Sequence, residues 1–188
     1  MQDNTLHFRA AAAEDAPVVA KLIQDGFRAP DSRAGWTGDL DDLAANFTAS
    51  EAEQLKYILN PDMIVVVAED QDHKPVGTFT ATKRSSDQGD HAWLSMLAVD
   101  TTRQRAGLGR RLLEYTEMYC QRTWGLSLIK LNALSTRDAL IAWYERRGYR
   151  RDGTSTPFPV HLSEFDGLKL PSDLCFINLE KRLEAAAE

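Results

Sequence analysis

The residues whose types and spacing could do chemistry lie in the segment Gln104-Arg105-Ala106-Gly107-Leu108-Gly109, which Arg110 and Arg111 follow directly. Two glycines allow a ligand to approach the backbone closely. If a helix begins here, its first amide groups and the positive end of its dipole attract an anion, and a pyrophosphate fits such a site. The segment is not a Walker loop, because no Gly-Lys-Ser/Thr follows. It also lacks the third glycine and the downstream acid of a dinucleotide-binding fingerprint.

The neighbouring elements place this segment between a strand and a helix. Residues 91–99 read as a strand that closes at Val99, and apolar residues recur at helical spacing from 108 to 124. Elsewhere we expect helices at 15–27, 40–59 and between Ser135 and Gly148, and strands at 6–10, 63–69, 76–83, 126–131, 149–151 and 174–179. Ser135 and Asp138 have the spacing of a capping box for the last helix. Because strands and helices interleave without a long repeat, we expect residues 1–188 to form one mixed α/β domain.

The charges are distributed unevenly along the chain. The net charge of −6 over 188 residues argues against a nucleic-acid partner. Residues 1–100 have a net charge of −9, whereas residues 101–151 carry 11 basic and 4 acidic side chains, a net charge of +7. This basic island indicates one local anionic ligand, and a solvated helix face is the alternative interpretation.

Other whole-chain features narrow the class of protein. The longest apolar run, Met63 to Ala68, is far too short to cross a bilayer, and residues 1–13 lack the pattern of a secretory signal, so we expect no membrane partner. Cys120 and Cys175 have neither CxxC spacing nor a histidine cluster nearby, so we expect no disulfide and no metal. These features predict a cytoplasmic protein. The sequence leaves open whether two copies form a homodimer.

Three segments together resemble a known family. The pattern Gln/Arg-x-x-Gly-x-Gly resembles motif A of the GNAT superfamily, the acetyl-CoA-dependent N-acetyltransferases. Leu97-Ala98-Val99-Asp100 resembles the family's fourth strand, and DALIAWYERRGY at 138–149 resembles its C-terminal helix motif. The resemblance implies a GNAT fold: a central, mostly antiparallel sheet of six to seven strands with flanking helices. In that fold the strands at 91–99 and 126–131 splay apart.

The resemblance also implies acetyl-CoA as cosubstrate. The free backbone edge of Leu97, Ala98 and Val99 would hold the pantetheine arm. The pyrophosphate would lie on the turn formed by Gln104, Arg105, Ala106, Gly107, Leu108, Gly109 and Arg110. The basic island then has a ligand of matching sign. Many members have an asparagine at the position of Arg137, so Arg137 either reaches a phosphate or is simply exposed.

Tyr144 stands at the position of the family's tyrosine and is the candidate general acid. A free tyrosine titrates near 10 and a thiol near 8.5, so a phenol can protonate the departing thiolate at neutral pH. The alternative interpretation is a core aromatic residue beside Trp143. The general base is left open, because no carboxylate lies between Ala92 and Val99. Ordered water, Ser95, His91 or an acid of the N-terminal half could take that role.

The acceptor is expected to be a primary amine of a small molecule or a peptide. Candidate acceptor residues are Trp36, Asp39, Trp93 and Phe158, since acidic and aromatic groups suit a cationic amine. Asp39 could equally cap a helix. Some members place a glutamate where this chain has Trp93. Its absence favours a second hypothesis, a non-catalytic acyl-CoA-binding module with the same fold.

Overall fold

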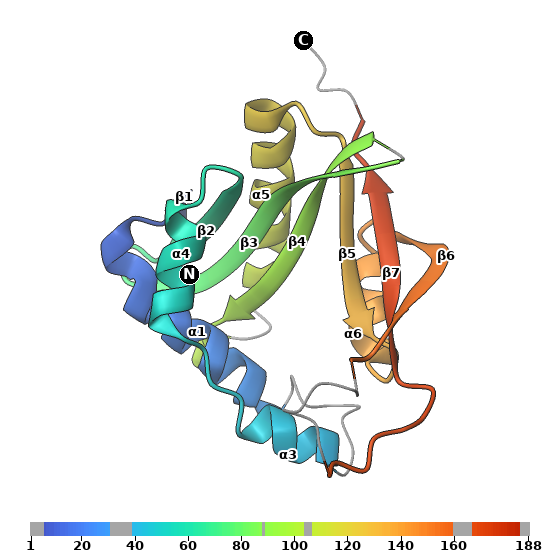
Figure 1. Cartoon of the computed structure of the whole chain (residues 1–188). Coiled ribbons are helices and arrows are strands. Elements are labelled where there is room, and N and C mark those ends of the chain that lie inside the picture. The colour runs from blue at the N-terminus through green and yellow to red at the C-terminus, as the bar shows by residue number, and fades with distance from the viewer. Residues whose placement is uncertain (1–5, 31–38, 88, 104–106, 160–166, 185–188) are drawn as a thin grey trace.

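The computed structural model describes residues 6–30, 39–87, 89–103, 107–159 and 167–184. Seven strands form one sheet in the order β1-β2-β3-β4-β5-β7-β6 (Figure 1). The strands are β1 (His7–Ala10), β2 (Met63–Glu69), β3 (Pro75–Ser86), β4 (Gly89–Val99), β5 (Leu128–Leu134), β6 (Arg150–Pro157) and β7 (Cys175–Arg182). Every neighbouring pair is antiparallel except β4 and β5, which are parallel. The expected mixed α/β fold with a mostly antiparallel sheet is therefore confirmed.

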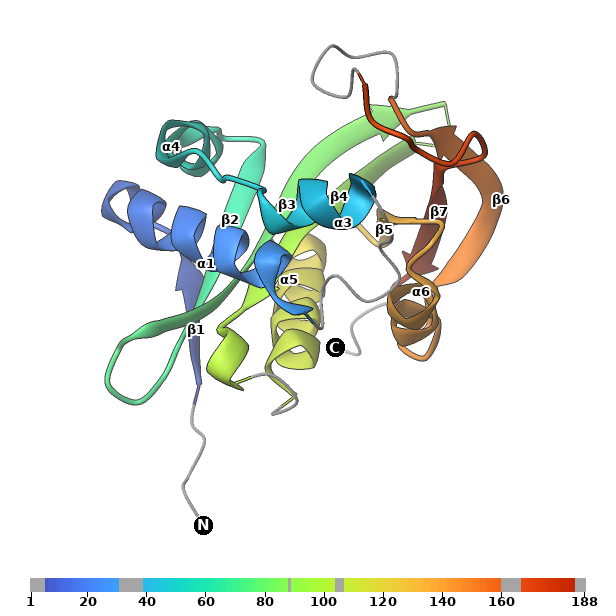
Figure 2. The same ribbon diagram turned by 90° about the horizontal axis from the view of Figure 1, so that it is seen from below.

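Helices cover both faces of the sheet. They are α1 (Ala16–Arg28), α3 (Asp39–Ala45), α4 (Glu51–Leu59), α5 (Leu108–Trp124) and α6 (Asp138–Glu145), with single 3-10 turns η1 (Ala13–Asp15) and η2 (Thr101–Arg103). Figure 2 shows α1 and α4 on one side of strands β2 to β4 and α5 on the other. In the part of the chain that the structure describes, no helix is both long and apolar enough to span a membrane.

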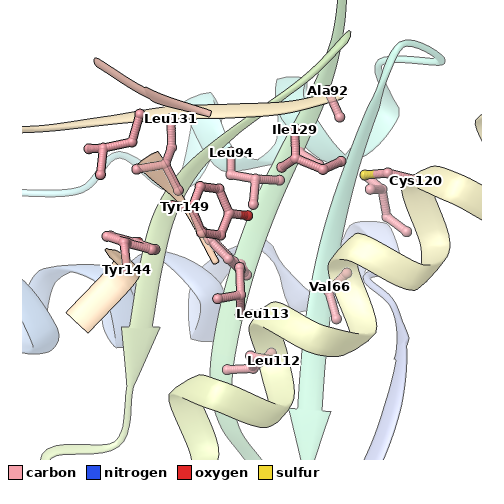
Figure 3. Packing of buried hydrophobic residues seen from close by; sticks show 14 of the residues in the cluster. Val66, Ala92, Leu94, Leu112, Leu113, Cys120, Ile129, Leu131, Tyr144 and Tyr149 are labelled. Carbon is pink, nitrogen blue, oxygen red and sulfur yellow. The ribbon is translucent and has the colours of Figure 1, made fainter. Parts of the chain in front are cut away.

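Strand β2 illustrates why the sheet is covered on both faces. Successive side chains of a strand point to opposite faces. Val66 therefore packs with Leu112 and Leu113 of α5, whereas Val65 and Val67 pack against α1 (Figure 3). A strand buried on both faces needs a continuous apolar run, which is what this segment has.

Some element boundaries differ from the sequence-based expectation. The helix expected at 40–59 is two helices, and Ser50 begins the second one by accepting a hydrogen bond from the Glu53 amide at 3.3 Å. Strand β6 continues to Pro157, into a segment expected to be a loop. The expected capping box is wrong: Arg137 is the N-cap of α6, and the Ser135 hydroxyl instead accepts from the Cys175 amide at 3.4 Å. This contact joins the start of β7 to the loop before α6.

Candidate active site

Strand β4 contains a bulge near its C-terminal end. Thr80 of β3 pairs with Ser95 and Thr78 pairs with Ala98, so β4 has one residue more than β3 between these two pairs. Within the bulge, Met96 has a φ of +58°, in the left-handed region that residues with a Cβ rarely adopt. A bulge bends its strand and increases the local twist. The bulge therefore bends the end of β4 away from the path of a regular strand.

The other edge of β4 is open over most of its length. Strands β4 and β5 pair only at Ala92 with Ile129 and at Trp93 with Lys130, and Figure 1 shows them diverging beyond that point. Backbone groups after Trp93 on this edge therefore have no ladder partner in β5 among the described residues, and they can bind an extended ligand. The predicted splay of these two strands is confirmed.

A cavity of about 580 Å³ lies at this opening. Nine of the residues predicted from the sequence line it: Leu97, Ala98, Val99, Gly107, Leu108, Gly109, Arg110, Arg137 and Tyr144. Gln104, Arg105 and Ala106 lie outside the described residues. The end of β4, the turn before α5, and α6 thus border a single cavity.

The turn before α5 provides free backbone donors. Gly107 is the N-cap of the 17-residue helix and has a φ of +75°, which a glycine adopts without steric cost. No side chain caps this end of the helix by a hydrogen bond in the described structure. The first-turn amides and the positive end of the dipole are therefore available to an anion in the cavity.

Tyr144 is both a core residue and part of the cavity wall. It is 5% exposed and packs edge-to-face with Trp143 and Tyr149, at ring-centroid distances of 4.9 and 5.5 Å. Figure 3 shows Tyr144 and Tyr149 among the buried residues. Burial raises the pKa of the phenol above its ordinary value, while the charges of Arg137 and Arg147 act in the opposite direction. Within the described residues, no hydrogen bond involves the Tyr144 hydroxyl. The phenol is therefore protonated at neutral pH.

The charge of the cavity wall is positive. Arg103, Arg110, Arg137 and Arg147 line it, and the described lining contains no carboxylate and no histidine. Arg103 is held by Asp70, whose carboxylate accepts from its guanidinium at 2.6 Å. Burial lowers the pKa of Arg137, which is not simply exposed. An anionic ligand is the natural occupant of such a cavity.

The candidate acceptor residues are not brought to this cavity. Trp93 stacks under the guanidinium of Arg84, 4.6 Å from the ring centroid, and Phe158 is buried against Phe176. Asp39 begins α3 and accepts from the backbone amide of Lys169. None of the three lines the cavity, and Trp36 lies outside the described residues.

Two residues that could take the role of general base, Ser95 and His91, lie in different places in the structure. Ser95 lines the cavity, whereas His91 is buried elsewhere with its Nδ1 3.3 Å from the Gly89 carbonyl oxygen. Among the described residues, no group of histidine, cysteine and acidic side chains could hold a metal ion.

Sequence reasoning missed several contributors to the cavity. Arg103 and Arg147 lie within the basic island, so their charge was visible but their position was not. Trp143 was considered only as a core neighbour of Tyr144, although it also lines the cavity. The bulge at Met96 left no signal, because neither glycine nor proline marks it.

Comparison with known proteins agrees with this geometry. The model of the acetyltransferase (GNAT) family matches residues 30–149, a range that includes β4, the glycine turn and Tyr144. The chain therefore belongs to the acetyltransferase (GNAT) family and is an acyltransferase. No curated protein matches the sequence.

Solved structures share the fold at low sequence identity. The Arabidopsis thaliana NAA60 structure, in complex with a bisubstrate analogue, has a TM-score of 0.70 at 14% identity. The match covers 96% of this chain and 100% of the NAA60 chain. The PaiA N-acetyltransferase of Thermoplasma acidophilum with coenzyme A has a TM-score of 0.68 at 14% identity, covering 95% and 99%. The Escherichia coli ribosomal-protein-S18-alanine N-acetyltransferase has a TM-score of 0.65 at 20% identity, covering 98% and 97%.

Proposed function

We propose that this protein transfers an acetyl group from acetyl-CoA to a primary amine of a small molecule or a peptide. The observation that carries the proposal is that one cavity is bordered by the open edge of β4, the Gly107 turn and Tyr144. Each of these three features suits a different part of the donor. The open edge of β4 suits an extended arm, the Gly107 turn suits an anion, and Tyr144 suits a leaving group. Their convergence is what a thioester donor requires.

The residues of the cavity suit acetyl-CoA. This cosubstrate supplies an acetyl thioester with a thiol as its leaving group. The first amides of α5 and the arginines of the wall would bind the phosphates, and the free backbone groups of Leu97 to Val99 would bind the amide-containing arm. A wall with four guanidinium groups and no described carboxylate has the sign that this ligand needs.

Tyr144 would act as the general acid. The neutral amine attacks the thioester carbonyl directly, the C–S bond breaks, and the sulfur takes the phenolic proton. Burial disfavours a phenolate and a departing thiolate alike, and the positive charges of Arg137 and Arg147 lower the cost of either anion. Burial and these charges therefore shift the pKa of the phenol and the pKa of the departing thiol in the same direction.

The amine loses its proton to water in this proposal. The described cavity wall has no carboxylate and no histidine to receive it, and Ser95 is the wall hydroxyl among the candidates for holding such a water. We place the reaction in the cytoplasm, which both free cysteines, Cys120 and Cys175, support.

The test has two stages. Calorimetry should detect acetyl-CoA binding to the purified protein. Thiol release at saturating acetyl-CoA is then followed with a panel of polyamines, amino acids, aminoglycosides and peptide N-termini. At least one amine class should accelerate release above the rate of hydrolysis, with acetylated product found by mass spectrometry. A protein that binds acetyl-CoA but acetylates no amine in the panel would contradict the proposed reaction.

A further inference from the structure

Arg147 lies just beyond α6, and its guanidinium is fixed on an aromatic surface. Its Cζ is 3.6 Å from the ring centroid of Trp143, and its Nη1 donates to the Trp143 carbonyl oxygen at 2.6 Å. These contacts hold the planar group in one orientation at the cavity wall. A guanidinium stacked in this way keeps its remaining donors directed outward from the ring edge.

Arg147 differs from two other arginines of the cavity wall in its contacts with carboxylates. Two other wall arginines have carboxylate partners, Arg103 at 2.6 Å from Asp70 and Arg110 at 2.9 Å from Glu114. No carboxylate among the described residues forms an ion pair with Arg147, and its Nε is buried without a hydrogen-bond partner. Burial lowers its pKa, the neighbouring charges of Arg146 and Arg110 lower it further, and the charge of Glu114 acts in the opposite direction. A partly buried cation beside other arginines is stabilised by an anion from outside the protein.

The position of Arg147 relative to the glycine turn limits which anion this is. The Cζ2 atom of Trp143 lies 3.8 Å from the point where a Cβ on Gly109 would stand. Gly109, which follows the turn, and the guanidinium of Arg147 therefore both lie beside the indole ring of Trp143. A ligand whose pyrophosphate lies on the turn needs a second anionic group close by to reach Arg147.

We propose that Arg147, held on Trp143, binds the 3′-phosphate of coenzyme A. This assignment rests on the proposed use of acetyl-CoA as donor. In coenzyme A the 3′-phosphate is joined to the pyrophosphate through a single ribose, so the two phosphate groups are close neighbours. Guanidinium groups bind phosphates through paired, charge-assisted hydrogen bonds, and a partly desolvated wall strengthens them.

The test compares coenzyme A with dephospho-coenzyme A, which lacks only the 3′-phosphate. Dissociation constants are measured by calorimetry for the parent and for Arg147→Gln. The parent should bind coenzyme A about tenfold to hundredfold more tightly than dephospho-coenzyme A, the value of one charge-assisted phosphate contact. Arg147→Gln should bind both ligands with nearly equal affinity, while its affinity for dephospho-coenzyme A stays that of the parent.

Arg146→Gln is the matched control, because it removes the same charge from the adjacent, exposed residue that does not line the cavity. It should keep the parent's preference for coenzyme A. If Arg147→Gln unfolds, Arg147→Met serves instead; it keeps an unbranched side chain against the Trp143 ring but has no charge, and should lose the preference.

Three results would overturn the assignment: a parent that binds the two ligands equally, an Arg147 variant that keeps the parent's preference, or an equal loss for both ligands, which would indicate a pyrophosphate contact. A parent that binds neither ligand would instead contradict the proposed function.

Discussion

The two edges of β4 differ in a way that separates structure from function. On one edge, nine residue pairs join β4 to β3, interrupted only by the bulge at Met96. On the other edge, two pairs join it to β5. A fully paired edge satisfies its backbone groups internally, whereas an open edge leaves them for a ligand. The same strand is thus fully paired on one side and has backbone groups available to a ligand on the other.

The side chains on the two sides of this strand follow the same division. Near the paired edge, Arg9 of β1 forms ion pairs with Asp15 of η1 and Glu69 of β2, each at 2.6 Å. Near the open edge, the described cavity wall has four guanidinium groups and no carboxylate. Ion pairs within the protein stabilise the fold, whereas a cavity wall that carries charges of one sign favours a ligand of the opposite sign. Changes on the open side should therefore affect binding and turnover, and changes on the paired side should affect stability.

The largest effect is expected from Tyr144→Phe, on the open side. Phenylalanine keeps the aromatic packing but has no proton to donate, so kcat should fall by about 10²- to 10⁴-fold with acetyl-CoA affinity retained. Because burial raises the pKa of this phenol above 10, the parent should keep its general acid protonated, and kcat should not decline between pH 7 and 9. Thiol release at saturating acetyl-CoA measures both quantities.

Tyr149→Phe is the control for this variant. Its hydroxyl donates to Glu117 at 2.8 Å in the core and does not line the cavity. This change should lower the free energy of unfolding by about 1–3 kcal/mol, because it leaves a buried carboxylate with one partner fewer, while kcat stays near that of the parent. A Tyr144→Phe enzyme as fast as Tyr149→Phe would remove Tyr144 from the mechanism.

A smaller effect, on binding rather than turnover, is expected at the glycine turn. Gly109 lies inside α5, and a Cβ there would be only in ordinary contact with Trp143. Gly109→Ala should therefore stabilise the helix by up to about 1 kcal/mol. The added methyl group nevertheless occupies the cavity wall where backbone would approach a phosphate, so acetyl-CoA affinity should fall about tenfold. Calorimetry and thermal unfolding would show binding and stability moving in opposite directions.

Gly107→Val and Gly125→Val form a matched pair at the two ends of the same helix. Both glycines have positive φ, +75° and +69°, and neither has an atom within 4 Å of an added Cβ. The two variants should lose similar stability through backbone strain, about 1–2 kcal/mol. Only Gly107→Val should weaken acetyl-CoA binding, because only Gly107 of the two lines the cavity. Equal affinities in the two variants would show that the turn does not hold the pyrophosphate.

The sequence predicted the turn and the residues around it because their chemistry is local. Gly107 and Gly109 are readable from spacing alone, since a tight approach to backbone requires residues without side chains. The change from strand to helical periodicity fixed where α5 begins. Leu97, Ala98 and Val99 followed from the family resemblance, and their role in binding stays a prediction; the structure places them on the open edge of β4 and in the cavity wall.

Features that depend on contacts between distant residues could not be predicted. The division of 40–59 into two helices is a different case, because the cap at Ser50 that begins the second helix is a local contact with Glu53. Ser135 had the spacing of a cap but bonds to Cys175, 40 residues away. The role of Arg147 depends on its stacking against Trp143 beside Gly109 of another helix, and no pattern in the chain indicates that contact.

The smallest effect on catalysis is expected from Asp15→Asn, on the paired side. Hydrogen bonds from Arg9 hold the pKa of this carboxyl below its ordinary value, and the Ala12 amide acts in the same direction. A carboxyl with a lowered pKa stabilises the fold above its unfolded pKa of about 4 and loses that contribution as the pH falls through the folded pKa. At pH 7 the variant should therefore be less stable by about 1–2 kcal/mol, with kcat and acetyl-CoA affinity unchanged. Below pH 4 the stability difference from the parent should narrow.

Asp25→Asn, which removes an exposed pair with Lys21, is the control and should change stability by less than about 0.5 kcal/mol at either pH. Chemical denaturation at pH 7 and pH 3.5 measures the stability difference. A fall in kcat or in acetyl-CoA affinity in Asp15→Asn would mean that the paired side also contributes to the site, and the division between the two edges of β4 would not hold.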